Sequence, residues 1–192
     1  MYTLIFATNN AHKIAEIQSL VGSDFSIIDM KSAGIDIDIP EPHHTLNENA
    51  LEKAQTIFNI TKTNCFSEDT GLEIEALNGA PGVKSARYAG EDRNFQANID
   101  KVLDQLKNVE NRKAQFRTVI CLIWEGQTYY FEGICKGHIS ISMQGEKGFG
   151  YDPIFVPEGS NKSFAEMSME EKNRFSHRQK AVTQLFEFLR KQ

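Results

Sequence analysis

The chain has 192 residues, enough for one sizeable domain or for two small lobes that share a sheet. With 40% hydrophobic and 24% charged residues, its composition is ordinary for a soluble globular protein. The formal net charge of −5 argues against broad attraction to nucleic acid, so an anionic ligand would need positive charge that is gathered locally.

Membrane insertion and secretion are not indicated either. The N-terminal residues lack the basic start and long apolar region of a signal peptide, and the longest purely apolar run, Val119 to Trp124, is far too short to span a bilayer. The three cysteines, Cys65, Cys121 and Cys135, form no C-x-x-C pair, and two of them lie in strand-like apolar runs. We therefore expect reduced core thiols and a cytoplasmic location.

The opening of the chain is typical of a strand, a polar loop and a helix. Residues 4–7 form a short apolar run, and the polar sequence Thr8-Asn9-Asn10 follows. The next apolar residues recur at helical spacing, which predicts a helix with one buried face. These residues are Ile14, Ile17, Leu20 and Val21.

An extended loop and a second helix are expected next. Prolines on both sides of Glu41 restrict its backbone, and a T-x-x-E capping box at Thr45 and Glu48 marks a helix start. The apolar stripe of that helix consists of Leu46, Ala50, Ala54, Ile57 and Phe58.

The rest of the chain alternates between β and α patterns. Residues 72–76 alternate apolar and acidic positions like a half-buried strand, and residues 95–106 carry apolar residues at helical spacing. Two β-rich runs, 114–124 and 128–139, flank Glu125-Gly126 and predict a hairpin.

The C-terminal part predicts a loop and short helices. A glycine-rich loop spans residues 145–150. Ser168 with Glu171 and Ser176 with Gln179 are capping-box patterns, and the second one starts a last helix. No clear linker or repeat interrupts residues 1–192. The order of the predicted helices and strands indicates a mixed α/β fold with an antiparallel portion in the middle.

Phosphate binding is suggested by residues 8–13. A loop between a strand and a helix N-terminus exposes backbone N–H groups and the positive end of the helix dipole, which suits phosphate. Asn9 and Asn10 can donate hydrogen bonds, and Lys13 adds a positive charge. Neither G-x-x-x-x-G-K nor G-x-G-x-x-G occurs, and a capped helix start with a surface lysine explains the pattern equally well.

Acidic residues suggest a Mg²⁺ site. Glu68 and Asp69 are adjacent, at what reads as the end of a short strand beside the turn residue Gly71. Mg²⁺ prefers hard oxygen ligands, and a carboxylate beside it can deprotonate a water molecule. Glu41, fixed between prolines, could be a second ligand. Taken alone, an acidic turn and a surface acid explain these residues better.

Two later segments could contact a base. In Gly148-Phe149-Gly150-Tyr151-Asp152, Phe149 offers a flat face and Asp152 a hydrogen-bond acceptor, although a turn with a core aromatic is a serious alternative. Lys172, His177 and Arg178 place positive groups near helix starts, where the dipole disfavours them. Such a placement favours an anionic or carbonyl-bearing ligand, and a solvated charged face is the alternative.

Taken together, these segments resemble the Ham1 or RdgB family of inosine-triphosphate pyrophosphatases. Any one segment is a weak signal, but the matches follow the family's order over nearly the whole chain. They are TNNAHKIAE at 8–16, IPE at 39–41, ENALEKA at 48–54, SEDTGLEIEALNGAPGVKSARYAG at 67–90, GFGYDPIF at 148–155, AEMSMEEKN at 165–173 and SHRQKA at 176–181.

The resemblance implies a fold and an activity. The fold would be mixed α/β, with a long central mixed sheet flanked by helices and two lobes that form a substrate cleft, usually as a homodimer. The activity would be Mg²⁺-dependent hydrolysis of ITP, dITP and XTP to the nucleoside monophosphate and pyrophosphate. A Maf-like pyrophosphatase of other specificity and a nucleotide-binding module without turnover are the alternatives. The GFGYD and SHR stretches argue against the first, and the presence of both Glu41 and Asp69 argues against the second.

The resemblance also implies residue roles. Glu41 and Asp69 would bind Mg²⁺, Asp69 would also accept the proton, and Thr70 would touch the substrate. The triphosphate would be held by Thr8, Asn9, Asn10, Ala11, His12, Lys13 and Lys53. The nucleoside end would be lined by Phe149, Gly150, Tyr151, Asp152, Lys172, His177 and Arg178.

Three positions depart from the family pattern. Glu68 stands where Asp is frequent and Thr70 where Ser is frequent, and both keep the chemistry. His43-His44 replaces a more usual Thr-Gly after the Pro-Glu pair, which affects the expected path of the loop near Glu41.

Overall fold

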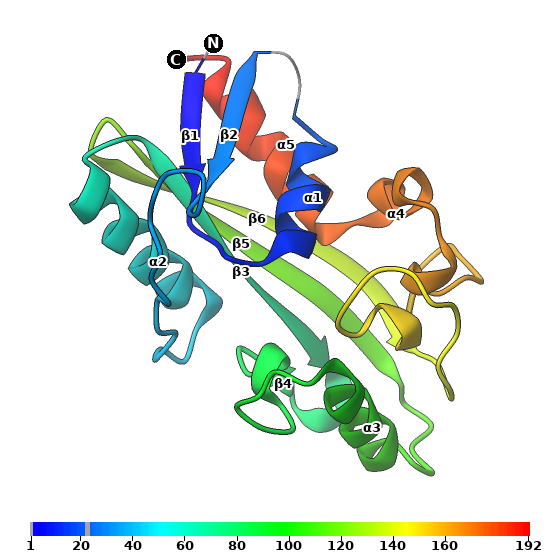
Figure 1. The fold of residues 1–192 in the computed structure, drawn as a ribbon. Coiled ribbons are helices and arrows are strands. Elements are labelled where there is room, and N and C mark those ends of the chain that lie inside the picture. The colour runs from blue at the N-terminus through cyan, green and yellow to red at the C-terminus, as the bar shows by residue number, and fades with distance from the viewer. Residues whose placement is uncertain (1, 22–23) are drawn as a thin grey trace. The chain divides into compact units, whose positions relative to one another are not determined.

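Apolar runs punctuated by turn-forming residues produce seven strands and five α-helices within residues 2–21 and 24–192, the part of the chain that the computed structural model describes (Figure 1). The strands are β1 (Tyr2–Phe6), β2 (Phe25–Asp29), β3 (Cys65–Ile74), β4 (Pro81–Gly82), β5 (Lys113–Trp124), β6 (Gln127–Ile139) and β7 (Phe155–Pro157). The helices are α1 (Ala11–Gln18), α2 (Leu46–Thr61), α3 (Phe95–Gln105), α4 (Met169–Phe175) and α5 (His177–Leu189).

The strands are hydrogen-bonded in the order β2-β1-β3-β5-β6-β7, and β4 pairs with β3. β1 pairs parallel to both β2 and β3, whereas the β3/β4 and β6/β7 pairs are antiparallel. The sheet is therefore mixed, and the predicted mixed α/β class with a central sheet and helices is confirmed.

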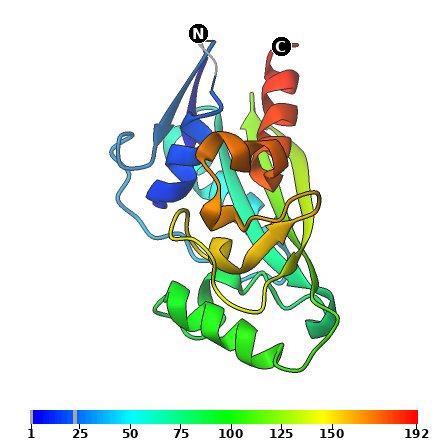
Figure 2. The same cartoon turned by 90° about the vertical axis from the view of Figure 1, so that its right-hand side faces the viewer.

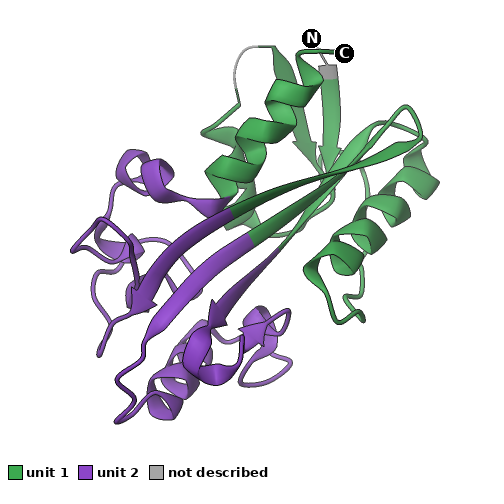
Figure 3. Ribbon diagram, turned by 180° about the vertical axis from the view of Figure 1, so that it is seen from behind, with its two compact units in different colours: residues 1–69, 118–133, 178–192 green, residues 70–117, 134–177 purple. Residues whose placement is uncertain are grey.

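The chain divides into two compact units (Figure 3). Unit 1 contains residues 1–69, 118–133 and 178–192, and unit 2 contains residues 70–117 and 134–177. Strands β3, β5 and β6 contribute residues to both. Each unit has its own hydrophobic core, which is how a compact unit is expected to be stabilised.

Unit 1 has helices on both faces of its strands. Phe66 of β3 packs in one core cluster with Ile17 of α1 and Leu185 of α5. On the other face, the Cys65 thiol donates to the Ala54 carbonyl of α2 at 3.3 Å. Successive side chains of a strand point to opposite faces, so β3 alternates between the α1/α5 side and the α2 side (Figure 1).

Unit 2 packs its half of the strands against α3 and a series of short segments. Its core combines Leu72 of β3, Val102 of α3 and Phe155 of β7. Figure 2 faces the loop that precedes β7, coloured yellow, and the short helical segments after it in orange. This loop is the glycine-rich segment predicted from the sequence, and it carries Phe149 and Asp152.

Most predicted boundaries are confirmed. The hairpin turns at Glu125-Gly126, both with positive φ as a two-residue turn requires, and α5 begins one residue after Ser176. The Ser168–Glu171 capping box is present in full. The three cysteines are free, buried thiols. No helix in the described chain has the length and apolar character needed to cross a membrane.

Three predictions on local structure were wrong in part. Helix α1 ends at Gln18, before Leu20 and Val21. Thr45 caps α2 as expected, but the Glu48 carboxylate accepts a hydrogen bond from the Thr45 hydroxyl at 2.7 Å, whereas in a capping box that carboxylate bonds to the N-cap backbone N–H. The strand expected at 72–76 ends at Ile74, because a short 3₁₀ turn takes up residues 75–77.

Candidate active site

The largest departure from expectation concerns the two adjacent acids. Glu68 and Asp69 are not at the end of a short strand or in a turn; they lie in the middle of the ten-residue strand β3. Both are buried in unit 1. Because neighbouring strand residues point to opposite faces, the two carboxylates lie on opposite sides of the strand and find different partners.

Asp69 lies on the α2 side, where Lys53 joins it to Glu41. The Lys53 ammonium donates to Glu41 Oε1 at 2.6 Å and to Asp69 Oδ1 at 3.2 Å. Lys53 is on the buried face of α2, and Glu41 is in the loop restricted by two prolines. Two acids that are 28 residues apart in the sequence thus share one cation within unit 1.

Burial and neighbouring charges act in opposite directions on the pKa values of this group. Burial raises the pKa of Asp69 above its ordinary value, although the positive charges of Lys53 and Lys13 act in the opposite direction. Burial alone would lower the pKa of Lys53, but the negative charges of Asp69 and Glu41 outweigh it and raise that pKa. Among the described residues, Asp69 Oδ2 has no hydrogen-bond partner, and it is fully buried. This oxygen is therefore a buried acceptor that the described protein groups leave unsatisfied.

Glu68 lies on the opposite side and is fully occupied by cations. Arg178 donates from Nε to Glu68 Oε2 at 2.7 Å and from Nη2 to Oε1 at 2.8 Å, a bidentate pair. The Lys13 ammonium is 3.0 Å from the same Oε1. The remaining guanidinium nitrogen, Nη1, donates to Glu16 of α1. Two cations and two carboxylates form a buried, charge-balanced group in unit 1.

This pairing keeps both partners ionised. Burial acts to raise the pKa of Glu68, but the charges of Arg178 and Lys13 outweigh it and hold the pKa far below its ordinary value. Burial acts to lower the pKa of Arg178, but the negative charges of Glu68 and Glu16 outweigh burial and raise that pKa. Arg178 is only 2% exposed, so its guanidinium serves this group rather than solvent.

The predicted phosphate loop follows β1 and leads into α1. Asn10 is the N-cap of α1, and its side chain accepts from the backbone N–H groups of His12 and Lys13 at 3.0 and 3.2 Å. Those two N–H groups, which the sequence suggested as free phosphate donors, are thus used by the cap. The Asn9 amide donates to the Ile37 carbonyl at 2.9 Å, and Thr8 Oγ1 accepts from the Asn10 N–H. Ala11 and His12 are exposed at the helix start.

The second group of predicted residues is in unit 2, on the glycine-rich loop and α4. Asp152 Oδ2 accepts from the Phe149 N–H at 2.9 Å and from the Lys172 ammonium at 2.6 Å. The same ammonium is 5.4 Å from the centre of the half-buried Phe149 ring. A side chain at Gly148 would collide with Asp152, and its φ of 76° also favours glycine. The loop thus holds an aromatic face beside a buried ion pair.

Tyr151 and His177 are part of the core of unit 2. The Tyr151 hydroxyl donates to the Ser85 carbonyl at 2.8 Å, and the His177 ring stacks on Phe116 with centroids 4.7 Å apart. Gly150 is half-buried in the same loop, and half-buried Thr70 follows Asp69 on β3.

The structure therefore divides the predicted residues by unit. In unit 1, Glu41, Lys53 and Asp69 form one group, and Lys13 and Arg178 meet at Glu68 in another. In unit 2, Phe149, Asp152 and Lys172 lie together. Arg178 contacts carboxylates of unit 1. Sequence reasoning did not single out Glu16. Its signal was weak, a carboxylate one helical turn after Lys13 and beside the apolar stripe of α1.

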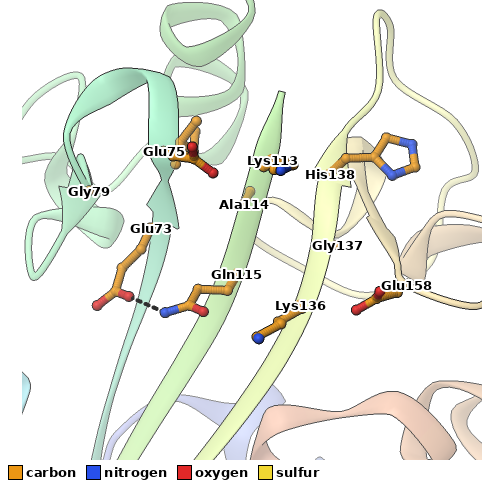
Figure 4. Close-up of a pocket in the computed structure, with 11 residues that line it drawn as sticks. Glu73, Glu75, Gly79, Lys113, Ala114, Gln115, Lys136, Gly137, His138 and Glu158 are labelled. Carbon is orange, nitrogen blue, oxygen red and sulfur yellow. Dashed lines mark hydrogen bonds between the residues drawn. The ribbon is translucent and has the colours of Figure 1, made fainter. Parts of the chain in front are cut away.

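A pocket of about 670 Å³ also opens on the strand face of unit 2 (Figure 4). It is lined by Glu73 and Gln115, which hydrogen-bond at 2.7 Å, by Lys136 and His138, and by neighbouring residues of these strands and the adjoining turns. None of the residues predicted for the site lines it. A polar outer face is ordinary for an antiparallel sheet, so this pocket carries no assignment.

Comparison with known proteins agrees with the sequence pattern. The sequence profile of the Ham1 family matches residues 4–188. This chain belongs to the Ham1 family. Two bacterial relatives of this Ham1 chain are dITP/XTP pyrophosphatases. That of Flavobacterium johnsoniae is 50% identical over 186 residues, covering 97% of each chain, and that of Porphyromonas gingivalis is 50% identical over 190 residues, covering 98% of each.

Solved Ham1 structures share the fold. The Ham1 protein of Staphylococcus aureus matches with a TM-score of 0.88 at 38% identity, covering 98% of both chains. The HAM1 protein of Coxiella burnetii matches with a TM-score of 0.91 at 35% identity, covering 100% of both. The family resemblance stated from the sequence is confirmed.

The Arg178 group makes a stability prediction for this Ham1 chain. Arg178→Ala leaves Glu16 and Glu68 buried without their shared cation, and we expect it to lower the free energy of unfolding by about 3–5 kcal/mol in urea denaturation. Arg174→Ala is the control, because it removes an exposed pair with Glu170 and should cost about 0.5 kcal/mol or less. Equal losses in the two variants would contradict the structural role of Arg178.

The lowered pKa of Glu68 makes a pH prediction. The folded state favours the ionised carboxylate, so its pairing stabilises the fold above the ordinary glutamate pKa of 4.5 and is lost progressively as the pH falls below it. We expect the stability gap between the wild type and Glu68→Gln, measured by urea denaturation, to be largest at neutral pH and to narrow in acid. A gap that stays constant across this range would show that the charge of Glu68 does not contribute.

Proposed function

We propose that this chain hydrolyses the non-standard purine nucleoside triphosphates dITP, XTP and ITP to the monophosphate and pyrophosphate, and so cleanses the nucleotide pool. The pyrophosphatase names of its relatives support the reaction and the substrates. One structural observation carries the chemistry: a buried Asp69 with one oxygen open to a ligand, beside Glu41 and Lys53.

Mg²⁺ is the expected cofactor, with Glu41 and Asp69 as its protein ligands. The open Asp69 Oδ2 and the proximity of the Glu41 carboxylate fit a hard cation that keeps several waters and takes further ligands from substrate phosphates. When bound, Mg²⁺ would offset the negative charge of the phosphates.

Asp69 is the proposed proton acceptor. A carboxylate with a raised pKa is a stronger base than an exposed one while it remains ionised at neutral pH, so Asp69 can take a proton from the attacking water. Lys53 holds the other Asp69 oxygen and so fixes its orientation. Lys13, whose charge also acts on Asp69, supplies positive charge for the triphosphate in a chain that is acidic overall.

The purine base is assigned to Phe149 and Lys172. Phe149 offers a stacking face, and the neighbouring Lys172 ammonium is a donor that suits the 6-oxo group of hypoxanthine or xanthine. Adenine would present its amino group, donor against donor, and an unpaired buried polar group costs about 1–3 kcal/mol. Arg178, which the sequence suggested as a base donor, uses three guanidinium nitrogens on two carboxylates of unit 1, whereas Lys172 pairs with Asp152 and lies beside the Phe149 ring, so Lys172 is the better candidate.

A cytoplasmic location and a homodimeric state complete the proposal. Three free, buried thiols suit a reducing compartment, where free nucleotides are also found. The homodimer follows from the family resemblance, and light scattering of the purified chain would test it.

The decisive test is pyrophosphate release from a panel of triphosphates. We expect rapid release from dITP, XTP and ITP, little from ATP, GTP or the pyrimidine triphosphates, and loss of all activity when a chelator removes Mg²⁺. A preference for dTTP or modified pyrimidines would favour a Maf-like specificity. Binding of dITP without turnover would favour a nucleotide-binding module.

Asp69→Asn tests the proton acceptor. The amide keeps the size of the side chain but cannot accept the proton, so we expect kcat for dITP to fall by roughly 10²–10⁴. Asp104→Asn, which makes the same change on the exposed side of α3, is the matched control and should leave kcat unaltered. If Asp69→Asn kept near-normal turnover, another residue would have to accept the proton.

A further inference from the structure

Glu16 is a buried carboxylate that the proposed reaction does not yet use. It lies on the second turn of α1 and is 5% exposed, although α1 is only eight residues long and starts at the surface. Carboxylates are rarely buried so completely unless they are paired. Glu16 accepts a hydrogen bond from Arg178 Nη1, and this pair connects it to the charged residues around Glu68.

The contacts of Glu16 lead to Lys13. Arg178, held by Glu16, clamps both oxygens of Glu68, and Glu68 Oε1 in turn lies 3.0 Å from the Lys13 ammonium. Lys13 and Glu16 are three residues apart on α1, so they lie on one face of the helix. The four side chains form a chain of contacts, Glu16 to Arg178 to Glu68 to Lys13, that joins α1 to β3 and α5 within unit 1.

Charge balance among these four side chains determines where the Lys13 ammonium lies. With both carboxylates ionised, two cations share two anions. If Glu16 lost its charge, Arg178 and Lys13 would compete more strongly for Glu68. The Arg178 side chain is 2% exposed and bidentate, whereas the Lys13 side chain is 16% exposed and can be solvated, so Lys13 would leave.

We propose that Glu16 is a positioning residue for the triphosphate: acting through Arg178 and Glu68, it holds the Lys13 ammonium where the phosphates bind. The proposal rests on the proposed function of Lys13. Arg178 then contributes to the reaction indirectly, because it links Glu16 to Glu68 within unit 1. Glu16 itself touches no reacting atom.

A double-mutant cycle tests the proposal through KM for dITP. Four proteins are compared, the wild type, Glu16→Gln, Lys13→Ala and the double variant. We expect Glu16→Gln to raise KM about tenfold, the scale of one charge-assisted hydrogen bond, with a smaller effect on kcat. In the Lys13→Ala background the same change should alter KM by no more than about twofold, because its effect passes through Lys13. Glu187→Gln, an equal charge change on the exposed side of α5, is the control and should leave KM unaltered.

The possible results separate the two proposals. If Glu16→Gln raises KM by the same factor with and without Lys13, or does not raise it at all, the positioning role is overturned while the proposed function stands. If the wild type releases no pyrophosphate from dITP, XTP or ITP, the proposed function fails and this proposal falls with it. Should Glu16→Gln not fold, Glu16→Asp keeps the charge at a shorter reach, and its smaller rise in KM must also vanish in the Lys13→Ala background.

Discussion

Two neighbouring carboxylates, buried on opposite faces of one strand, are the constraint on which this structure depends. An ionised carboxylate without a counter-charge is very costly in a protein interior. Glu68 and Asp69 therefore each require a cation on their own side of β3. Lys53 of α2 provides one, and Arg178 of α5 with Lys13 of α1 provides the other.

The two sides solve the same problem differently. On the α1/α5 side, every oxygen of Glu68 is occupied and the charges balance, which is the arrangement of a fixed structural element. On the α2 side, two acids share one lysine, and Asp69 Oδ2 has no partner in the described part of the chain. The alternation of a β-strand thus separates a fully paired carboxylate from a partly paired one by a single residue.

The local patterns of the chain were sufficient for much of the fold. Capping residues placed the starts of α2, α4 and α5, and the glycine after Glu125 placed the hairpin, because these signals act over a few residues. The acids of β3 were misjudged for the same reason. Within a short window Ser67-Glu68-Asp69 is typical of a turn, and only cations from distant helices make it compatible with a buried strand.

The sequence named the residues of the candidate site but not the contacts that connect them. The family resemblance indicated Glu41, Lys53 and Asp69, yet the ammonium bridge between the acids depends on how α2 packs against β3. Arg178 and Glu68 are 110 residues apart, and no spacing rule relates them. Glu16 escaped notice because a single acid on an amphipathic helix is usually solvated.

The open oxygen of Asp69 has a consequence for the stability of the whole chain. A buried acceptor without a partner makes the fold less stable than it would be with that acceptor paired. A cation that occupied this oxygen would relieve that strain and couple loading of the site to the melting temperature. Selection for a more heat-resistant chain would therefore act against the unpaired oxygen of this aspartate.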